Sequence, residues 1–351
     1  MFKAENITVS NNDKLSTLSD LSTMLSAGIP LLESVEALLE DAKGNQKKFL
    51  GALRDDLNQG KHVYFTFSKF PNVFSKVIAS IVKASEEAGT LDVTLRDLKE
   101  NLKKDMEFSD KIRSAMIYPL FIVGLFFAVL LMMLIVVIPK IATVFSRMNV
   151  VLPLPTKIMI SMSNAIMNQT GFVVVGIAVF IFLALLLYKK QKKFLLGLLV
   201  KLPVLSSLTK DIDLTKFSRN FYLLLNAGIP ITNALELTEN VVVNPEVRAG
   251  IRRAKEEVAS GKKLSEGFKN NRKIFPSIMI RITEAGERSG SLDKSMSEIS
   301  DFLDYQVSNK LKTATALLEP IMLVAIGGGV GGMMLAIIGP IYSMIGQVGV
   351  K

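Results

Sequence analysis

The chain of 351 residues contains no cysteine, no tryptophan and only one histidine, His62. The missing cysteines exclude a disulfide framework, a Cys/His zinc site and a cysteine nucleophile, and a Ser-His-Asp triad would depend on His62 alone. Because no acid–base partner accompanies this imidazole in the sequence, we interpret His62 as a structural residue. The composition therefore predicts a protein that is not an enzyme and has no catalytic residue, cofactor or metal site.

Charge is missing from three long stretches, residues 114–139, 158–188 and 320–350. Apolar residues make up 49% of the chain and its mean hydropathy is +0.37, which suggests membrane spans joined to soluble parts. A helix needs about 20 apolar residues to cross the hydrocarbon core of a bilayer. The stretches predict transmembrane helices at 114–139, 171–188 and 317–345, of which the second is the shortest.

The positive charges predict how the chain is oriented in the membrane. Lysine and arginine gather before the first span and after the second, whereas residues 140–170 hold only three. Cytoplasmic loops carry the excess of positive charge, so the N-terminus is predicted inside and the C-terminus outside. The polar residues 1–14 predict no signal peptide. The predicted parts are a first cytoplasmic helical domain (1–113), transmembrane helix 1 (114–139), an outer loop (140–170), transmembrane helix 2 (171–188), a second cytoplasmic helical domain (189–316), transmembrane helix 3 (317–345) and an outer tail (346–351).

Short motifs recur about 200 residues apart. LSAGIP at 25–30 recurs as LNAGIP at 225–230, and KASEEAGTL at 83–91 recurs as EAGERSGSL at 284–292. Repetition at a nearly fixed offset indicates a duplicated unit. Because two predicted spans separate the starts of the two copies, both soluble copies are expected on the same side of the membrane, as parallel repeats.

Both copies are expected to be all-α. Apolar residues recur at helical spacing in each, and only the short run 62–67 alternates as a strand would. Each LxAGIP motif is interpreted as a corner, in which glycine closes one helix in the left-handed conformation and proline enters the first turn of the next. A second glycine ends a later helix in each copy. These structural roles fall on Gly28, Pro30, Gly89, Gly228, Pro230 and Gly290.

Three carboxylates attract notice. Glu86 and Glu287 precede the second glycine of each copy and could contact a partner or a cation, although a solvated carboxylate in a polar corner needs no such role. Glu319 lies at the entrance of the third span, where an ionisable residue suggests a function. A helix N-terminus and interfacial water could equally satisfy it.

The third span carries the glycine-rich run GGGVGG at 327–332, which formally fits a dinucleotide motif but follows no strand. Small residues four apart instead allow helices to approach closely in a membrane. The residues predicted to take part in membrane helix packing are Gly327, Gly328, Gly331, Gly332, Glu319, Pro119 and Pro320.

The net charge of +10 lies mainly in the second soluble domain, where lysines after residue 188 would meet anionic lipid. No basic motif interleaved with aromatic residues accompanies that charge, so binding to nucleic acid is not expected. No Walker A sequence occurs, and the chain is not expected to hydrolyse ATP.

The signatures at 18–40, 217–240 and 284–292, with LLEP at 317–320, resemble the GspF/PilC family of bacterial inner-membrane platform proteins, which serve type II secretion systems and type IV pili. The similarity covers about residues 15–345. The short stretch before the first signature is more similar to the compact members that serve type IVb pili.

The resemblance implies a platform that couples a cytoplasmic assembly ATPase to the polymerisation of pilins or pseudopilins. It implies an inner-membrane location with the outer loop and tail in the periplasm, contacts with pilin transmembrane helices, with other inner-membrane assembly proteins and with the lipid bilayer, and a homo-oligomer of unspecified number. The ATPase is expected mainly on the more basic second domain, with the first domain contributing because parallel repeats put both on one side of the membrane. Its candidate contact residues there are Arg252, Arg253, Lys262 and Lys263.

Two other classes of protein compete with the platform. A secondary transporter would also be built from repeats, but its polar substrate requires charged or broken helices near the midplane, and the predicted spans are free of charge there. An intramembrane enzyme would need histidine, cysteine or paired aspartates within the spans. Uptake by proteoliposomes would support the transporter, and loss of pili or secretion on deletion would support the platform.

Overall fold

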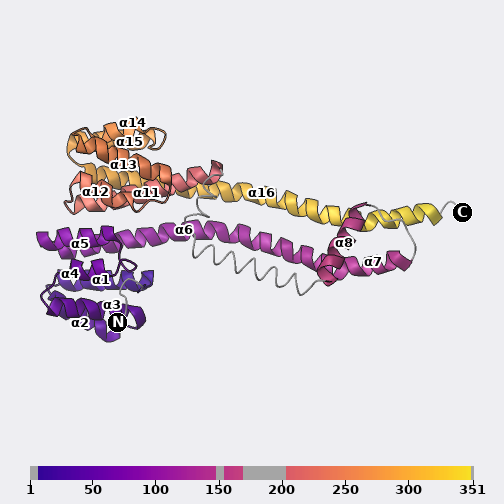
Figure 1. Cartoon of the computed structure of the whole chain (residues 1–351), viewed down its shortest axis with the longest axis horizontal. Helices are drawn as coiled ribbons and strands as arrows, with labels where there is room; N and C mark the ends of the chain where they lie inside the picture. The colour runs from indigo at the N-terminus through magenta and orange to yellow at the C-terminus, as the bar shows by residue number, and fades with distance from the viewer. Residues whose placement is uncertain (1–6, 148–153, 169–202, 349–351) are drawn as a thin grey trace. The chain divides into compact units, whose positions relative to one another are not determined.

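The computed structural model describes residues 7–147, 154–168 and 203–348, and this part of the chain forms helices and no strand (Figure 1). The chain divides into two compact units. One unit comprises residues 1–111 and 197–308, and the other comprises residues 112–196 and 309–351. The predicted second span, 171–188, lies outside the described residues.

The first unit contains two helical segments, described for residues 7–111 and 203–308 and called here the first and second segments. Helices α6 and α16 begin in these segments and continue beyond them. Helices of the first segment are α1 (Asn11–Ser26), α2 (Leu31–Asp41), α3 (Gly44–Asn58), α4 (Val63–Lys69), α5 (Lys76–Ala88) and α6 (Leu91–Met132). Helices of the second segment are α11 (Pro203–Asn226), α12 (Ile231–Glu239), α13 (Pro245–Ala259), α14 (Leu264–Asn270), α15 (Ser277–Ser289) and α16 (Leu292–Val348).

Phenylalanine forms the centre of the core in both segments. In the first, the buried rings of Phe67 and Phe74 stack with their centroids 4.3 Å apart. In the second, Phe268 and Phe275 stack at 4.2 Å. These pairs stand at the same offset of 201 residues that relates the sequence motifs. Burial of such large apolar surfaces is the main stabilising contribution to each bundle.

The glycine corners have the backbone that the sequence predicts. Gly28 and Gly228 have φ of 82° and 76°, a region that residues with a Cβ rarely adopt. The two prolines differ from the expectation, since each immediately precedes its helix instead of entering the first turn. The carbonyl of Pro30 accepts the N–H of Ser34 at 2.9 Å, so proline closes the first helical hydrogen bond from the capping position.

The run 62–67, in which the sequence suggests strand-like alternation, belongs to helix α4. Its alternation is too short to outweigh the tertiary contacts, because Val63, Thr66 and Phe67 are buried on one side of a helix of about two turns. The carboxylate of Glu86 also holds the start of this helix, as described below.

The second unit contains the later part of α6, a π-helical stretch (Met133–Val137), α7 (Ile138–Arg147), α8 (Leu154–Asn168) and the later part of α16. The π-helical stretch ends two residues before Pro139, whose missing N–H prevents a regular helical bond. Within the stretch, the carbonyl of Leu134 accepts the buried hydroxyl of Ser163 from α8. Helix α8 therefore satisfies a carbonyl of the irregular turn.

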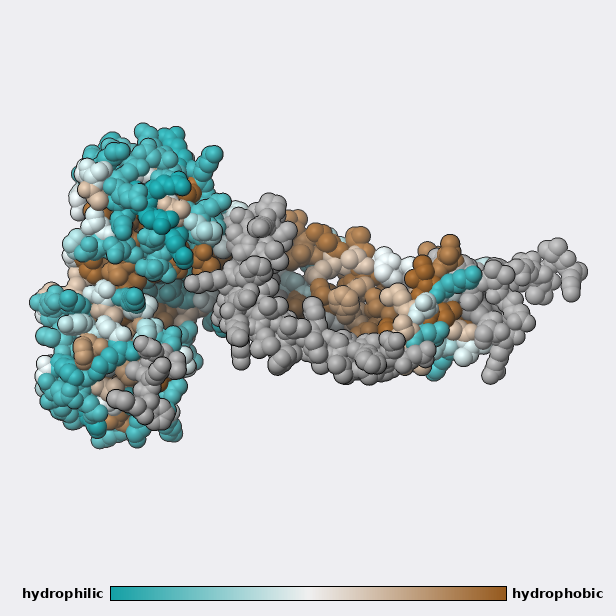
Figure 2. Space-filling view, viewed as in Figure 1, coloured by the Kyte–Doolittle hydropathy of each residue, from teal (hydrophilic) through white to brown (hydrophobic). Residues whose placement is uncertain are grey.

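Two helical stretches are long and apolar enough to cross a membrane, Leu91–Val144 and Leu292–Gly332. Their most apolar windows have mean hydropathies of 3.3 and 1.6, and only 11% and 0% of the residues in them are buried. Figure 2 shows hydrophobic side chains gathered along these stretches and hydrophilic ones over the bundles. Apolar surface that stays exposed needs a lipid or protein environment.

Helix α6 has no end at residue 113, where the sequence sets the boundary of the first domain. It runs without interruption from Leu91, and α16 likewise from Leu292. Hydropathy detects where a helix becomes apolar, and both helices begin many residues earlier with charged, amphipathic turns.

Candidate functional site

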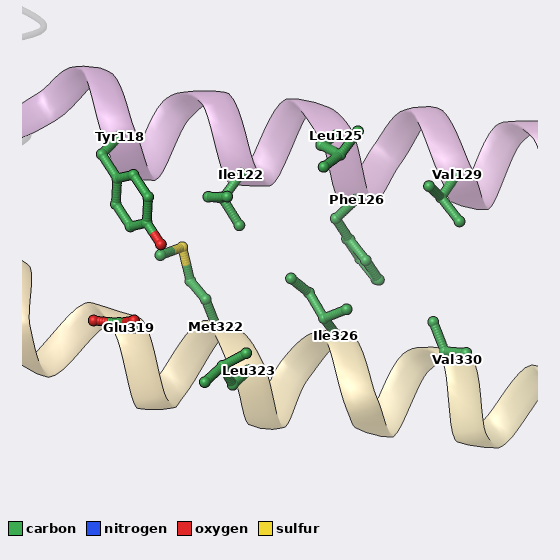
Figure 3. Close-up of a pocket in the computed structure, with 10 residues that line it drawn as sticks. All are labelled: Tyr118, Ile122, Leu125, Phe126, Val129, Glu319, Met322, Leu323, Ile326 and Val330. Atoms are coloured by element: carbon green, nitrogen blue, oxygen red, sulfur yellow. The ribbon is translucent and has the colours of Figure 1, made fainter.

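Helices α6 and α16 line an apolar groove within the second unit. Its cavity volume is about 210 Å³. In Figure 3, Phe126 of α6 and Ile326 of α16 point into the groove. The lining residues are Tyr118, Ile122, Leu125, Phe126, Val129, Glu319, Met322, Leu323, Ile326 and Val330.

The two sides of this groove use equivalent positions. Shifting Ile122 by the offset of 201 residues gives Leu323, and shifting Val129 gives Val330, which both line the other side. The same shift takes Tyr118 to Glu319, the one carboxylate among the described residues that line the groove. The two walls of the groove are therefore nearly matched in apolar residues, and Tyr118 and Glu319 form its polar end.

The structure places Glu319 inside α16 and not at a helix N-terminus. The helix begins at Leu292, so the N-terminal dipole cannot satisfy this carboxylate as the sequence suggested. Pro320 is accommodated within the same helix, and Pro119 within α6. The charge of Glu319 is exposed on the described surface, which leaves water, lipid headgroups or a partner to solvate it.

Of the glycines of α16, one contacts α6 closely and the predicted ones do not. A Cβ built on Gly329 would lie 3.0 Å from the ring of Phe126. A Cβ on Gly327, Gly328, Gly331 or Gly332 would meet nothing within 4 Å among the described atoms. These four glycines take no part in close packing within the described chain, and their packing against a partner helix stays a prediction.

Glu86 and Glu287 have equivalent partners inside the fold. Glu86 accepts the backbone N–H groups of Val63 at 2.8 Å and Tyr64 at 3.2 Å, which are the first residues of α4. Glu287 accepts those of Leu264 at 2.6 Å and Ser265 at 3.3 Å, at the start of α14. Each carboxylate thus caps a helix from a distant part of the sequence. A contact of either with a partner stays a prediction.

A second carboxylate of the first segment, the buried Asp56, also contacts α4. It accepts hydrogen bonds from Thr66 and Lys69 at 2.8 Å and from Lys61 at 3.1 Å. Burial would raise the pKa of Asp56, but the bonds from these three side chains outweigh it, and the pKa lies below its usual range. The ionised carboxylate ties α3 to α4 and to the turn that precedes it.

Ion pairs join the two segments of the first unit. Arg219 of α11, whose side chain is 3% exposed, contacts Asp105 of α6 at 2.6 Å and Asp304 of α16 at 3.2 Å. Its guanidinium also lies over the ring of Phe108, 5.5 Å from the centroid. Lys104 adds a pair with Asp301 at 2.9 Å. Sequence reasoning missed this cluster, because charges spaced along three helices give no local motif.

The predicted ATPase-contact residues are exposed in α13 and in the turn before α14. Arg253 donates to the side chain of Asn271 at 3.2 Å, and Lys262 lies 3.8 Å from Glu257. Arg252 and Lys263 make no ion pair with any residue that the structure describes. Two of the four charges are therefore fully available at the surface.

No group of three or more metal-ligating side chains is present among the described residues. His62 is exposed and lies 3.3 Å from Glu86, and its ring stacks with Tyr64 at 5.8 Å. Glu86 is thus a carboxylate partner of His62 that the sequence does not reveal. The groove offers an apolar binding surface.

Comparison with known proteins points to one family. The model of the family described as "Type II secretion system (T2SS), protein F" matches residues 17–139 and again 217–340. The chain is 30% identical to the type IV pilus assembly protein PilC of Thermus thermophilus over 336 residues, which is 94% of this chain and 82% of that protein. It is 27% identical to PilC of Pseudomonas aeruginosa over 333 residues, 94% of this chain and 89% of that protein. It is 26% identical to the type II secretion system protein F of Vibrio cholerae over 339 residues, 96% and 83% of the two chains.

Proposed function

The chain belongs to the protein F family of type II secretion systems, and from this premise we propose that it is a platform protein in the inner membrane of a bacterium. It serves the assembly of a type IV pilus or of a secretion pseudopilus. It performs no chemistry itself, and couples a cytoplasmic assembly ATPase to the polymerisation of pilins or pseudopilins.

The observation that carries this proposal is the continuity of α6 and α16. Each helix has residues in both compact units. At 1.5 Å per residue, the 42 residues of α6 and the 57 residues of α16 extend about 63 Å and 86 Å. In this proposal each helix carries residues of the polar bundle and apolar residues in one continuous element, which supports a coupling of the two parts.

The two segments repeat one duplicated cytoplasmic unit in this proposal, with three membrane spans. The matching of one family model to both parts of the chain supports the duplication. Reporter fusions test the topology. Fusions near Asp110 and after Lys193 should report the cytoplasm, and fusions near Val151 and after Lys351 the periplasm. A cytoplasmic signal at Val151 would contradict the three-span arrangement.

The groove between α6 and α16 is the proposed contact for an apolar pilin helix. Its lining is almost wholly aliphatic and aromatic, and the open surface at Gly327 and Gly331 lets a partner backbone approach closely. A partner helix docked there would exchange lipid for protein contacts on exposed residues such as Leu323, which is 65% exposed.

The ATPase is proposed to bind the basic surface of the second segment. We compare the double charge reversal of Arg252 and Lys263 to Glu with the same reversal of Lys43 and Lys47, two exposed lysines of the first segment. Both variants change the net charge equally. The first should reduce co-purification of the ATPase and abolish filament assembly at a normal protein level, and the second should do neither. Equal effects of the two pairs would refute the assigned surface.

The purified chain should show no ATPase activity of its own, and deletion should abolish filament assembly or secretion. Retention of both processes in a deletion strain would refute the platform function, independently of which surface holds the ATPase.

A further inference from the structure

A cavity of about 540 Å³ opens between the first and second segments. It is bounded by α1, the loop before α5, the first turn of α5, α6, α11 and the end of α12. This volume is within the range of sites for small organic molecules, about 300–1,000 Å³. It shares no lining residue with the apolar groove of α6 and α16, and it does not include Arg252, Arg253, Lys262 or Lys263. We call it the intersegment cavity.

Three lysines line the intersegment cavity, each from a different helix. They are Lys14 of α1, Lys76 of α5 and Lys216 of α11. None of the three forms an ion pair with a described carboxylate. Burial raises the pKa of Asp213, and the charge of Lys216 partly opposes this shift by electrostatic attraction, without a direct contact. The single carboxylate in the lining, Asp105, is already held at 2.6 Å by Arg219. The cavity thus gathers positive charge that the fold does not neutralise.

The burial of Lys14 makes this imbalance costly. Burial lowers the pKa of Lys14 from its usual value, because no anion compensates the desolvated ammonium. The helix start adds to the same field, since the residues from Ser75 to Ile78 line the cavity and a helix N-terminus favours anions. The side-chain oxygen of Ser75 accepts the N–H of Ile78 at 3.4 Å.

The remaining walls are of two kinds. Val73, Phe74 and Leu98 supply apolar surface, and Asn101 and Asn220 supply amides. A lone inorganic ion would leave the apolar walls unused, whereas a phosphate group on an organic body would use both. A concave site of this kind favours a small molecule over the surface of a folded partner.

We propose that the intersegment cavity binds a small polyanion that carries phosphate groups, held by Lys14, Lys76 and Lys216 at the start of α5. The ligand contacts both segments, so its binding stabilises their association. This inference does not depend on the platform function.

Calorimetric titration of the full chain in nanodiscs tests the proposal, with pyrophosphate as the probe. The triple variant K14Q/K76Q/K216Q is compared with K43Q/K47Q/K269Q, which removes the same charge from exposed lysines outside the cavity. The wild type should bind one pyrophosphate per chain, the first variant about tenfold or more weakly, and the second within about twofold of wild type. The single variant K76Q, which changes an exposed side chain, should weaken binding while keeping the thermal transition of the free protein.

Nanodiscs of phosphatidylcholine alone and nanodiscs containing phosphatidylglycerol distinguish the source of the phosphate. If pyrophosphate binds with the same affinity in both kinds of nanodisc, the ligand of the cavity is a soluble molecule. If phosphatidylglycerol weakens the binding of pyrophosphate, the ligand is a lipid headgroup. Failure of the wild type to bind pyrophosphate at low ionic strength, or equal weakening by the two triple variants, would overturn the proposal. Neither result would bear on filament assembly.

Discussion

Replacing Arg219 by alanine should weaken the association of the two segments more than any exposed charge deletion. Arg219 is almost fully buried, and it holds Asp105 of the first segment and Asp304 of the second at the same time. Its loss leaves Asp304, whose side chain is 18% exposed, paired with Lys111 at 3.1 Å among the described residues. Asp105 is left with no ion pair among the described residues.

The size of the effect follows from the burial of the three groups. Removing one partner of a buried ion pair costs about 3–5 kcal/mol, because the other charge stays desolvated. Asp105 is 38% exposed, and solvent screens its charge in the variant. Lys111 still pairs with Asp304 in the variant and partly compensates its charge. We therefore expect a cost at the low end of the range, about 3 kcal/mol. For a unit of this size that corresponds to a fall in Tm of about 6–12 °C.

Thermal unfolding in detergent, followed by far-ultraviolet circular dichroism, measures the change. The matched control is Arg288→Ala, which removes an exposed pair with Glu284 on one turn of α15 and should cost about 0.3–0.5 kcal/mol. A double-mutant cycle with Asp105→Asn isolates the coupling. If Arg219→Ala lowers the Tm no more than Arg288→Ala does, the ion pairs do not hold the segments together.

Four further substitutions have defined outcomes. Gly28→Val and Gly228→Val force a β-branched residue into positive φ, and each should cost at least about 1 kcal/mol; normal abundance and protease resistance of both would contradict this. Asp56→Asn should cost about 1–3 kcal/mol at pH 7. Because the folded pKa of Asp56 is lowered, that deficit should shrink in pH-dependent melts as the pH falls below about 4, where the unfolded carboxyl protonates. Gly286→Ala would put a Cβ 2.7 Å from that of Ser295 and should lower the Tm through about 1–3 kcal/mol of overpacking, whereas Gly51→Ala, with open space around it, should not.

Local signals in the sequence predict the helices and their corners well. The left-handed conformation of Gly28 and Gly228 follows from glycine between an apolar helix and a proline, which is a property of a few adjacent residues. The long apolar stretches likewise need no tertiary information, because hydropathy alone identifies segments that avoid water.

Contacts between distant residues are where sequence reasoning fails. Glu86 stands 22 residues from the N–H of Tyr64 that it caps, and no spacing rule relates them. The alternation of residues 62–67 is likewise no guide to α4, since what holds this helix is the distant carboxylate of Glu86 and the burial of Phe67. Gly329 is the glycine of the run that packs on Phe126. The sequence alone cannot distinguish it from the neighbouring glycines, because the distinction depends on where α6 lies.

The contact between the two segments is asymmetric, although both segments are built from six helices in the described chain. At the offset of 200 that relates the corners, Arg219 corresponds to Ser19, and at the offset of 201 that applies further along, Asp304 corresponds to Lys103 and Asp105 to Gln306. Exchanging the roles of the segments would replace the ion pairs by serine, glutamine and lysine, which cannot form them. Two copies of either segment alone would lack these ion pairs, so the charges favour contact of one segment with the other. The shared order of helices therefore accounts for how each bundle folds, while the charges that differ between the bundles account for which bundle each one meets in this chain.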